Sequence, residues 1–468
     1  MPSIPTPSSS AELAARTVKR ITRRLIPFLF ILYIIAFLDR VNVAYAALQM
    51  TADLGFSPEV FGFGAGIFFI GYFIFEVPSN LILEKVGAQK WIARIMITWG
   101  IVSSAFMFTD DVAWGSVATW FGCTDAEFTF YVLRFLLGAC EAGFFPGIIL
   151  YLTYWFPSAR RAKTIALFMT AIAISNVIGA PVSGAIMQFM HGMGGLRGWE
   201  WLFLLEGLPS IVVGVLVFVF LPNGPMQAHW LDDKEKQFIV NQVQLDEAEK
   251  ESLGKGHRFM DAFSDVRVWG LALVYFSGVV CFYAINFWMP TIIQEVGIDK
   301  KDFFKVGLIS IIPWGISAVA MVYWGAHSDR TGERRWHVAG SLIMTVAGLV
   351  GLTQVGHSPI PSLIALTLVA AGALCFVSTF WSLPTAFLSG TAAAAGIAFV
   401  NSVGNLGGHF GPDLIGRIRT LSGGASEAAF WALAAIAAVG MVITLVLPNT
   451  QKKLPSDRKS TRLNSSHT

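Results

Sequence analysis

Long apolar stretches alternate with short polar segments along almost the whole chain. A bilayer core of about 30 Å requires about 20 consecutive apolar residues in a helix. Gly and Pro inside several stretches are compatible with membrane helices. The pattern predicts an all-α membrane protein with twelve transmembrane helices, at residues 27–49, 60–82, 91–109, 128–155, 164–190, 199–221, 268–294, 303–326, 337–356, 360–388, 391–413 and 426–448.

The longest polar stretch, residues 222–267, divides these spans into two halves of six. It contains HWLDDKEKQFIVNQVQLDEAEKE, a charged and partly amphipathic helix candidate that we interpret as a cytosolic linker on the membrane surface. The basic N-terminus has no small-residue cleavage site, so it is interpreted as a retained leader. The expected segments are an N-terminal cytosolic segment at 1–26, a six-helix bundle at 27–221, the linker at 222–267, a second bundle at 268–448, and a disordered tail at 449–468 that could be non-native.

Composition supports the membrane assignment. The 468 residues are 54% hydrophobic and 13% charged, whereas soluble domains carry about 25% charged residues. The net charge of +3 is too small to imply a nucleic-acid partner. The sequence offers no nucleophile–base set, metal cluster or phosphate loop, so we expect neither an enzyme nor a bound cofactor.

Lysine and arginine predict the orientation. With the N-terminus inside, 25 of the 33 basic residues fall in inside segments and 6 in outside loops. Cytoplasmic loops carry such an excess. Both termini are therefore expected in the cytoplasm, with a bacterial inner membrane as the preferred location.

A short motif recurs after the second span of each half. The chain reads GAHSDRTGERR from Gly325 and NLILEKVGAQK from Asn80. The shared spacing is typical of transporters built from two related halves with the site between them. The candidate gating residues are Glu84, Lys85, Gly87, Gly325, Asp329, Arg330, Gly332 and Arg334.

The second copy of the motif matches GxxxDRxGxR[KR] fully, and with twelve spans the chain resembles the major facilitator superfamily over about residues 20–450. The first copy departs from it, with Asn80 in place of Gly and Ala88-Gln89 in place of the arginine pair. The resemblance implies that the loops latch the inside gate. The alternative is that their charges only mark the inside face.

Three further strings give a narrower resemblance. FLDRVNVAYA, FEVPSNLILEKVGA and RFLLGACEAGFFPGIILYLTYWFP resemble the anion:cation symporter family, which includes sugar-acid, tartrate and phthalate-type permeases. All three lie in the first half of the chain, so they bear on coupling more than on substrate.

Charged residues inside predicted spans are the main chemical signal. Arg134 and Glu141 lie seven residues apart, close to two helical turns, so both project from one face. Asp39 and Arg40 lie midway along the first span. Charges at bilayer depth are costly unless they face a cavity or a partner, so we expect a polar chamber. There Arg40 can bind a carboxylate and Asp39 can exchange a proton.

The family resemblance assigns roles to these residues. It implies that Glu141 accepts the coupling proton, that Arg134 is coupled to it, that Asp39 is the other titrating acid and that Arg40 binds the substrate anion. Glu76 and Glu206, also at membrane depth, are interpreted as structural. The remaining expected substrate contacts are Tyr72, Ser378, Trp381 and Asn401.

The sequence thus predicts a secondary transporter, a symporter of protons and a small organic anion, working as a monomer by alternating access. The anion would be a sugar acid, a tartrate-like acid or an aromatic carboxylate. The alternatives are a proton antiporter or an organophosphate exchanger of the same fold and, less favoured, a non-transporting membrane sensor.

Overall fold

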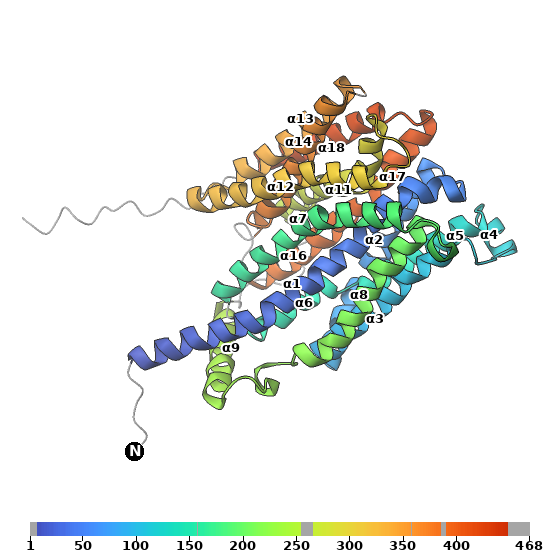
Figure 1. The fold of residues 1–468 in the computed structure, drawn as a ribbon. Helices are drawn as coiled ribbons and strands as arrows, with labels where there is room; N and C mark the ends of the chain where they lie inside the picture. The colour runs from blue at the N-terminus through green and yellow to red at the C-terminus, as the bar shows by residue number, and fades with distance from the viewer. Residues whose placement is uncertain (1–6, 157, 254–264, 357, 385–389, 448–468) are drawn as a thin grey trace, which may run out of the picture.

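The computed structural model describes residues 7–156, 158–253, 265–356, 358–384 and 390–447. Within these ranges every regular element is a helix (Figure 1). Eleven helical segments there are long and apolar enough to cross a membrane. The all-α membrane fold predicted from the hydrophobic pattern is confirmed.

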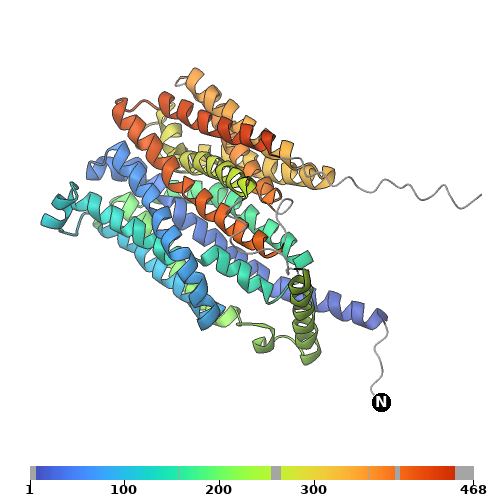
Figure 2. The same cartoon turned by 180° about the vertical axis from the view of Figure 1, so that it is seen from behind.

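The first half of the chain forms one bundle, and the second half forms another beside it (Figures 1 and 2). The first contains α1 (Pro7–Leu54), α2 (Pro58–Val86), α3 (Ala88–Ala105), α4 (Ser116–Trp120), α5 (Asp125–Glu141), α6 (Phe144–Thr153), α7 (Ser158–Phe189) and α8 (Gly198–Phe220). The second follows α9 (Asp233–Leu253) and contains α11 (Val266–Glu295), α12 (Phe303–Thr331), α13 (Arg335–Gln354), α14 (Pro359–Phe380), α16 (Gly390–Asn405), α17 (Gly407–Leu421) and α18 (Glu427–Val446). Short 3₁₀ turns occur at Phe106–Phe108, Met193–Gly195 and Pro225–Gln227.

Helix α1 is much longer than its predicted span. It begins at Pro7 and runs for 48 residues, through Pro27. Residues 7–26 include three Ala, two Leu and four Arg, all of which favour helix. Arg16 and Arg20 both pair with Glu235 at the start of α9, at 3.2 and 2.9 Å. The N-terminal segment is therefore a continuation of α1 that holds the linker helix against the first bundle.

Two of the predicted spans are broken. The span at 128–155 divides into α5 and α6 at Ala142 and Gly143, where Gly143 has a φ of +83° that a side chain would disfavour. The span at 391–413 divides into α16 and α17 at Leu406, between Asn405 and Gly407. Glycine and proline close to both breaks remove the side-chain and backbone contacts that keep a helix continuous.

The two ends of the bundle differ. We call the end where α1 begins and α2, α8 and α12 finish the N-terminal end, and the other the opposite end. At the opposite end the halves touch closely. A Cβ added at Gly62 would lie 2.5 Å from the carbonyl oxygen of Pro412, and one at Gly307 would lie 2.3 Å from that of Ala180. Glu59 also pairs with Arg417 across the halves at 3.4 Å.

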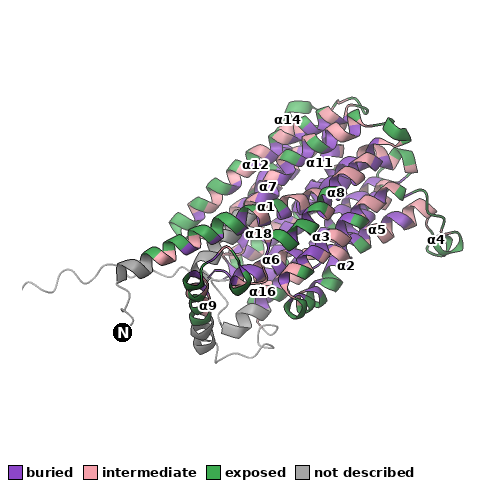
Figure 3. Cartoon of the chain, turned by 60° about the horizontal axis from the view of Figure 1, so that its bottom comes forward, coloured by how far each residue is buried: buried purple, intermediate pink, exposed green. Residues whose placement is uncertain are grey.

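Exposed residues lie on the outward side of the helices (Figure 3), and many of them are large and apolar. Val77 on α2, Val219 on α8 and Val319 on α12 are 62–72% exposed. Such surface is uncommon on soluble proteins and is expected where helices meet lipid. The charged residues at bilayer depth that the sequence singled out, Asp39, Arg40, Arg134 and Glu141, lie inside the bundle instead.

Candidate functional site

A cavity of about 120 Å³ lies between the two halves, near the middle of the bundle. Four helices of the first half and three of the second contribute to its wall, and Trp381 follows the end of α14. The lining residues are Tyr33, Phe37, Arg40, Phe68, Phe69, Tyr72, Glu76, Phe145, Ile172, Tyr275, Val279, Phe282, Tyr283, Val377, Trp381, Asn401 and Asn405. A mainly aromatic chamber with a few convergent polar groups is the usual form of a small-molecule site.

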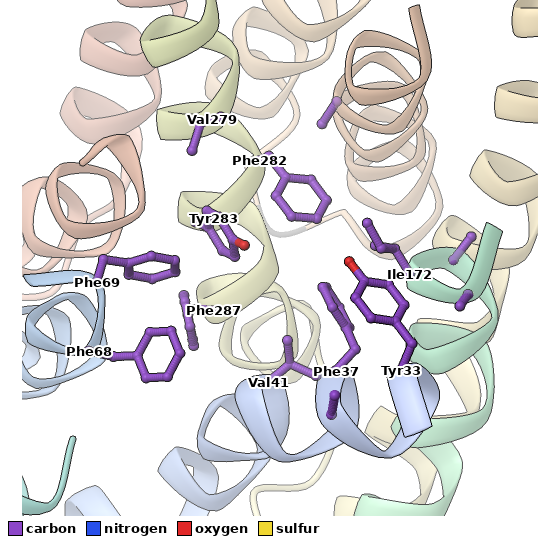
Figure 4. Close-up of a cluster of buried hydrophobic side chains, with 14 of the residues drawn as sticks. Tyr33, Phe37, Val41, Phe68, Phe69, Ile172, Val279, Phe282, Tyr283 and Phe287 are labelled. Atoms are coloured by element: carbon purple, nitrogen blue, oxygen red, sulfur yellow. The ribbon is translucent and has the colours of Figure 1, made fainter. Parts of the chain in front are cut away.

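Aromatic rings from both halves meet around this chamber (Figure 4). The ring centroids of Phe69 on α2 and Tyr283 on α11 lie 4.4 Å apart. The hydroxyl groups of Tyr33 and Tyr283 point toward the same central space. Rings of this kind supply apolar area and a polar edge at low conformational cost.

Arg40 supplies the positive charge of the chamber. It projects from the middle of α1 and keeps 14% of its side chain exposed. Its guanidinium donates to a carboxylate oxygen of Glu141 on α5 and, at 3.1 Å, to the hydroxyl of Tyr283 on α11. It also lies 5.7 Å from the ring centroid of Tyr72, within range of a cation–π interaction. One guanidinium therefore joins both halves of the molecule.

Glu141 and Arg134 do not pair with each other, although both lie on α5 and both are fully buried. Arg134 instead donates to the carbonyl oxygens of Gly64 and Ala65 on α2, at 3.2 and 2.9 Å. The second oxygen of Glu141 has no hydrogen-bond partner among the described residues. The spacing of seven residues indicated a shared face, but the partner of Glu141 comes from another helix.

Asp39 is turned away from the chamber. It accepts hydrogen bonds from Ser103 on α3 and Ser210 on α8, both at 2.7 Å, and from Asn42 at 3.3 Å. Adjacent helical residues point about 100° apart, which explains why Asp39 and Arg40 face different neighbours. Of the four charged residues singled out in the sequence, only Arg40 lines the cavity.

Of the other four expected substrate contacts, three line the cavity and one does not. Tyr72, Trp381 and Asn401 line the cavity, whereas Ser378 does not. The hydroxyl of Ser378 donates to the carbonyl oxygen of Cys375, one turn earlier on α14, at 2.9 Å.

Glu76 also lies at the wall of the cavity, a position for which the sequence favoured a structural interpretation. It lines the cavity and accepts a hydrogen bond from the Asn401 amide, across the two halves, at 3.2 Å. Tyr72 and Glu76 are one helical turn apart, so both face the chamber. The sequence contained this signal, because Tyr72 was an expected substrate contact and Glu76 lies one turn later on the same face of the helix.

The repeated loops are organised within each half. After α12, Asp329 pairs with Arg334 at 2.6 Å, and Gly332 ends the helix with a φ of +68°. Arg335 donates to the carbonyl oxygen of Leu447 beyond α18, at 3.0 Å. Four further gating candidates lie near the ends of α2 and α12: Glu84, Lys85, Gly325 and Arg330. The side chains of Glu84 and Lys85, on α2, are exposed.

The loop between α2 and α3 is also fixed to a neighbouring helix of its half, but by different residues. Gly87 has a φ of +95° and joins α2 to α3. The backbone N–H of Gln89 donates to Asn223, which follows α8, at 2.9 Å, and its side chain donates to the carbonyl oxygen of Phe218 at 2.8 Å. The hydrogen bonds of both loops join helices of one half to each other. A latch between the halves stays a prediction.

Residues 29–412 match the family model of the Major Facilitator Superfamily. This match covers well over half of the chain. The chain belongs to the major facilitator superfamily. It is a multi-pass membrane transporter of the secondary class, not an enzyme.

Two bacterial relatives of this transporter cover nearly its whole length. One, from Agrobacterium vitis, is named "Putative tartrate transporter"; it is 48% identical over 96% of this chain and 94% of its own. The other, from Pseudomonas putida, is named "Putative metabolite transport protein NicT" and is 43% identical over 92% of this chain and 94% of its own. The predicted family is confirmed.

The fold of this major facilitator also matches a solved structure. The crystal structure of a D-xylose-proton symporter superposes with a TM-score of 0.70 and covers 92% of this chain and 98% of its own. The sequence identity is 15%, so the likeness concerns the fold alone.

Proposed function

We propose that this transporter carries a small organic anion together with protons, as a monomer that works by alternating access. The anion is a carboxylate, namely a tartrate-like hydroxy acid, a sugar acid or an aromatic acid. The name of the Agrobacterium vitis relative, a putative tartrate transporter, supports a substrate of this class. The excess of basic residues at the N-terminal end supports a cytoplasmic location for both termini, and we place the protein in a bacterial inner membrane.

One observation carries the proposal. Arg40 lines the cavity, and its carboxylate partner is Glu141. A guanidinium presents a planar set of donors that matches a carboxylate. An arriving anion and Glu141 therefore compete for the same group, and the outcome depends on the charge of Glu141.

Protonation resolves this competition. A buried ion pair that loses one charge leaves the other uncompensated, which costs several kcal/mol. When Glu141 takes up a proton, Arg40 needs a new anionic partner, and the substrate carboxylate supplies it. Proton and anion thus favour each other's binding, as linkage requires. In this scheme Asp39 and Arg134 also take part in proton coupling, although neither residue lines the cavity.

The rest of the wall would recognise the body of the substrate. Tyr72 and Tyr283 flank Arg40, while Asn401 and Glu76 supply an amide and a carboxylate from opposite halves. Trp381 supplies an apolar surface with one donor. Hydroxyl groups of a sugar acid or a tartrate-like acid can donate to Glu76 and to the carbonyl of Asn401. We retain Ser378 as a contact for another conformation.

Alternating access requires the opposite end to separate. The contacts Gly62–Pro412 and Gly307–Ala180 close it in this conformation, together with the pair Glu59–Arg417. We propose that the two bundles rock about the chamber, which breaks these contacts and forms others at the N-terminal end.

The test uses purified protein in liposomes and a panel of labelled tartrate, sugar acids, aromatic carboxylates, amines and organophosphates. The proposal predicts that an inwardly directed proton gradient drives carboxylate accumulation, and that collapsing the gradient stops it. Accumulation driven by the reverse gradient would indicate an antiporter, and phosphate-for-phosphate exchange an organophosphate exchanger. Binding without flux would indicate a sensor. Protein-free liposomes are the control.

A further inference from the structure

A second carboxylic acid lies beside Asp39, deep in the first bundle. Glu206 is on α8, one helical turn before Ser210, which donates to Asp39. Only 7% of Glu206 is exposed, and it does not line the cavity. Its Oε1 accepts a hydrogen bond from Ser183 on α7 at 2.7 Å.

The amide of Asn42 lies near both acids. Its Nδ2 donates to Asp39 Oδ1 at 3.3 Å, and its side chain lies close to the carboxyl group of Glu206. Asn42 is almost completely buried. One amide side chain, which carries both donors and an acceptor, therefore lies close to both carboxyl groups.

Two buried acceptor atoms at this point have no partner among the described residues: Glu206 Oε2 and Asn42 Oδ1. An unsatisfied buried polar atom is costly, and two acceptors cannot satisfy each other. A proton on Glu206 Oε2 changes this, because the resulting O–H can donate to Asn42 Oδ1. A single proton would satisfy both atoms and remove one of two neighbouring negative charges.

No cation offsets this pair among the contacts that the described residues make. The side chains that meet the two acids are Ser103 on α3, Ser183 on α7, Ser210 on α8 and Asn42 on α1. Arg40, the nearest cation in sequence, turns toward Glu141. Two buried carboxylates without a counter-charge cannot both remain ionised at low cost.

We propose that Glu206 is a proton-carrying residue of the transport cycle, and that it shares a proton site with Asp39 through Asn42. The inference rests on the proposed proton coupling. In the conformation described here Glu206 is the protonated member and Asp39, with three donors, the ionised one. The step is a proton transfer only: Glu206 gives its proton to water that enters when the site opens, the hydrogen bond from its O–H to Asn42 is lost, and Asn42 keeps its bond to Asp39.

A contact between the halves could control that release. Tyr45, three residues beyond Asn42 on α1, lies close to Ser310 on α12 and to Glu206. Opening the opposite end separates α1 and α7 from α12, because the Gly307–Ala180 contact must break. Water would then reach the Glu206 site through the position of Tyr45.

The first test measures the ratio of protons to anions from the reversal potential of uptake in liposomes, for wild type and for Glu206→Gln. We expect Glu206→Gln to carry one proton fewer per anion and to lose one step of its pH profile, while anion counterflow continues. An unchanged ratio and an unchanged pH profile would overturn the inference. If wild type carries no protons, the proposed function itself fails, so the two failures are distinguishable.

The second test does not depend on transport. Infrared difference spectra near neutral pH should contain the C=O stretch of a protonated carboxylic acid that is absent from Glu206→Gln. The matched control is Glu200→Gln on the same helix, because Glu200 is paired with Arg197. In Asn42→Ala the same band should shift, since the acid loses its acceptor. A spectrum identical in wild type and Glu206→Gln would overturn the inference.

Discussion

Arg40 and Glu141 form an ion pair at the wall of the central cavity, although they lie 101 positions apart in the sequence. The pair joins α1 to α5, and a second donor of Arg40 reaches Tyr283 in the other half of the molecule. Because of this position, an anion in the cavity and a proton on Glu141 would both act on the interactions of Arg40.

Replacing Glu141 by Gln should abolish uphill uptake and leave exchange intact. The amide cannot ionise, so the site behaves as if the proton were permanently bound and Arg40 stays available for the anion. Accumulation under a proton gradient should fall to the level measured without a gradient, while counterflow of labelled anion persists.

Glu127→Gln is the matched control for this change. Glu127 is on the same helix but caps its first turn at the surface, and its variant should accumulate anion like wild type. Equal accumulation in Glu141→Gln and wild type would contradict the assigned role.

Arg40→Lys should weaken anion binding while keeping the positive charge. Lysine has no planar fork and cannot bridge a carboxylate and Tyr283 in the same way. Loss of one hydrogen bond to a charged group costs roughly 1.5–3 kcal/mol, so we expect roughly a 10- to 100-fold rise in Kd by calorimetry. Arg94→Lys, at a residue that stacks on Trp91 outside the cavity, is the control and should bind normally.

Glu76→Gln should change which anions are preferred. An ionised Glu76 disfavours a second carboxylate in the chamber, and two charges about 7 Å apart repel by roughly 2 kcal/mol at an effective dielectric constant of about 20. The Gln variant should therefore bind a dicarboxylate at least about tenfold better relative to a monocarboxylate. Competition assays with the two anions measure this ratio, and an unaltered ratio would show that Glu76 does not face the substrate.

Gly307→Ala should hinder closure of the opposite end. The added Cβ would lie 2.3 Å from the carbonyl oxygen of Ala180, and overpacking of this kind costs roughly 1–3 kcal/mol. We expect slower transport, and faster reaction of a thiol introduced near Pro58 with a reagent added from the opposite end. Gly315→Ala on the same helix meets no atom within 4 Å, so it should transport like wild type. Identical behaviour of the two variants would exclude this contact as a closing element.

The hydrophobic pattern was sufficient to predict the fold. Apolar stretches of membrane length, the linker before α11 and the repeated loop motif each correspond to a feature of the structure. The extension of α1 to Pro7 was missed, because the polar residues before Pro27 looked like a leader rather than a helix that docks on α9. The breaks at Gly143 and Leu406 depend on local backbone geometry, which an apolar run does not reveal.

The site was predictable only as a set of residue types. Charges at bilayer depth singled out Arg40, Glu141, Arg134 and Asp39, and all four point into the bundle. Their partners depend on how helices pack side by side. Spacing along α5 suggested that Arg134 and Glu141 act together, whereas the carbonyl groups of α2 occupy Arg134 and α1 brings Arg40 to Glu141. Contacts between distant segments of this kind cannot be derived from periodicity.

The most direct measurement of the central claim is proton uptake on anion binding. Purified protein in a weakly buffered solution with a pH indicator is mixed with tartrate or another carboxylate that the panel shows to bind. If anion and proton are linked through Arg40 and Glu141, binding makes the solution more alkaline in wild type and leaves it unchanged in Glu141→Gln. Anion binding with no proton uptake in wild type, or with the same uptake in Glu141→Gln, would contradict the mechanism.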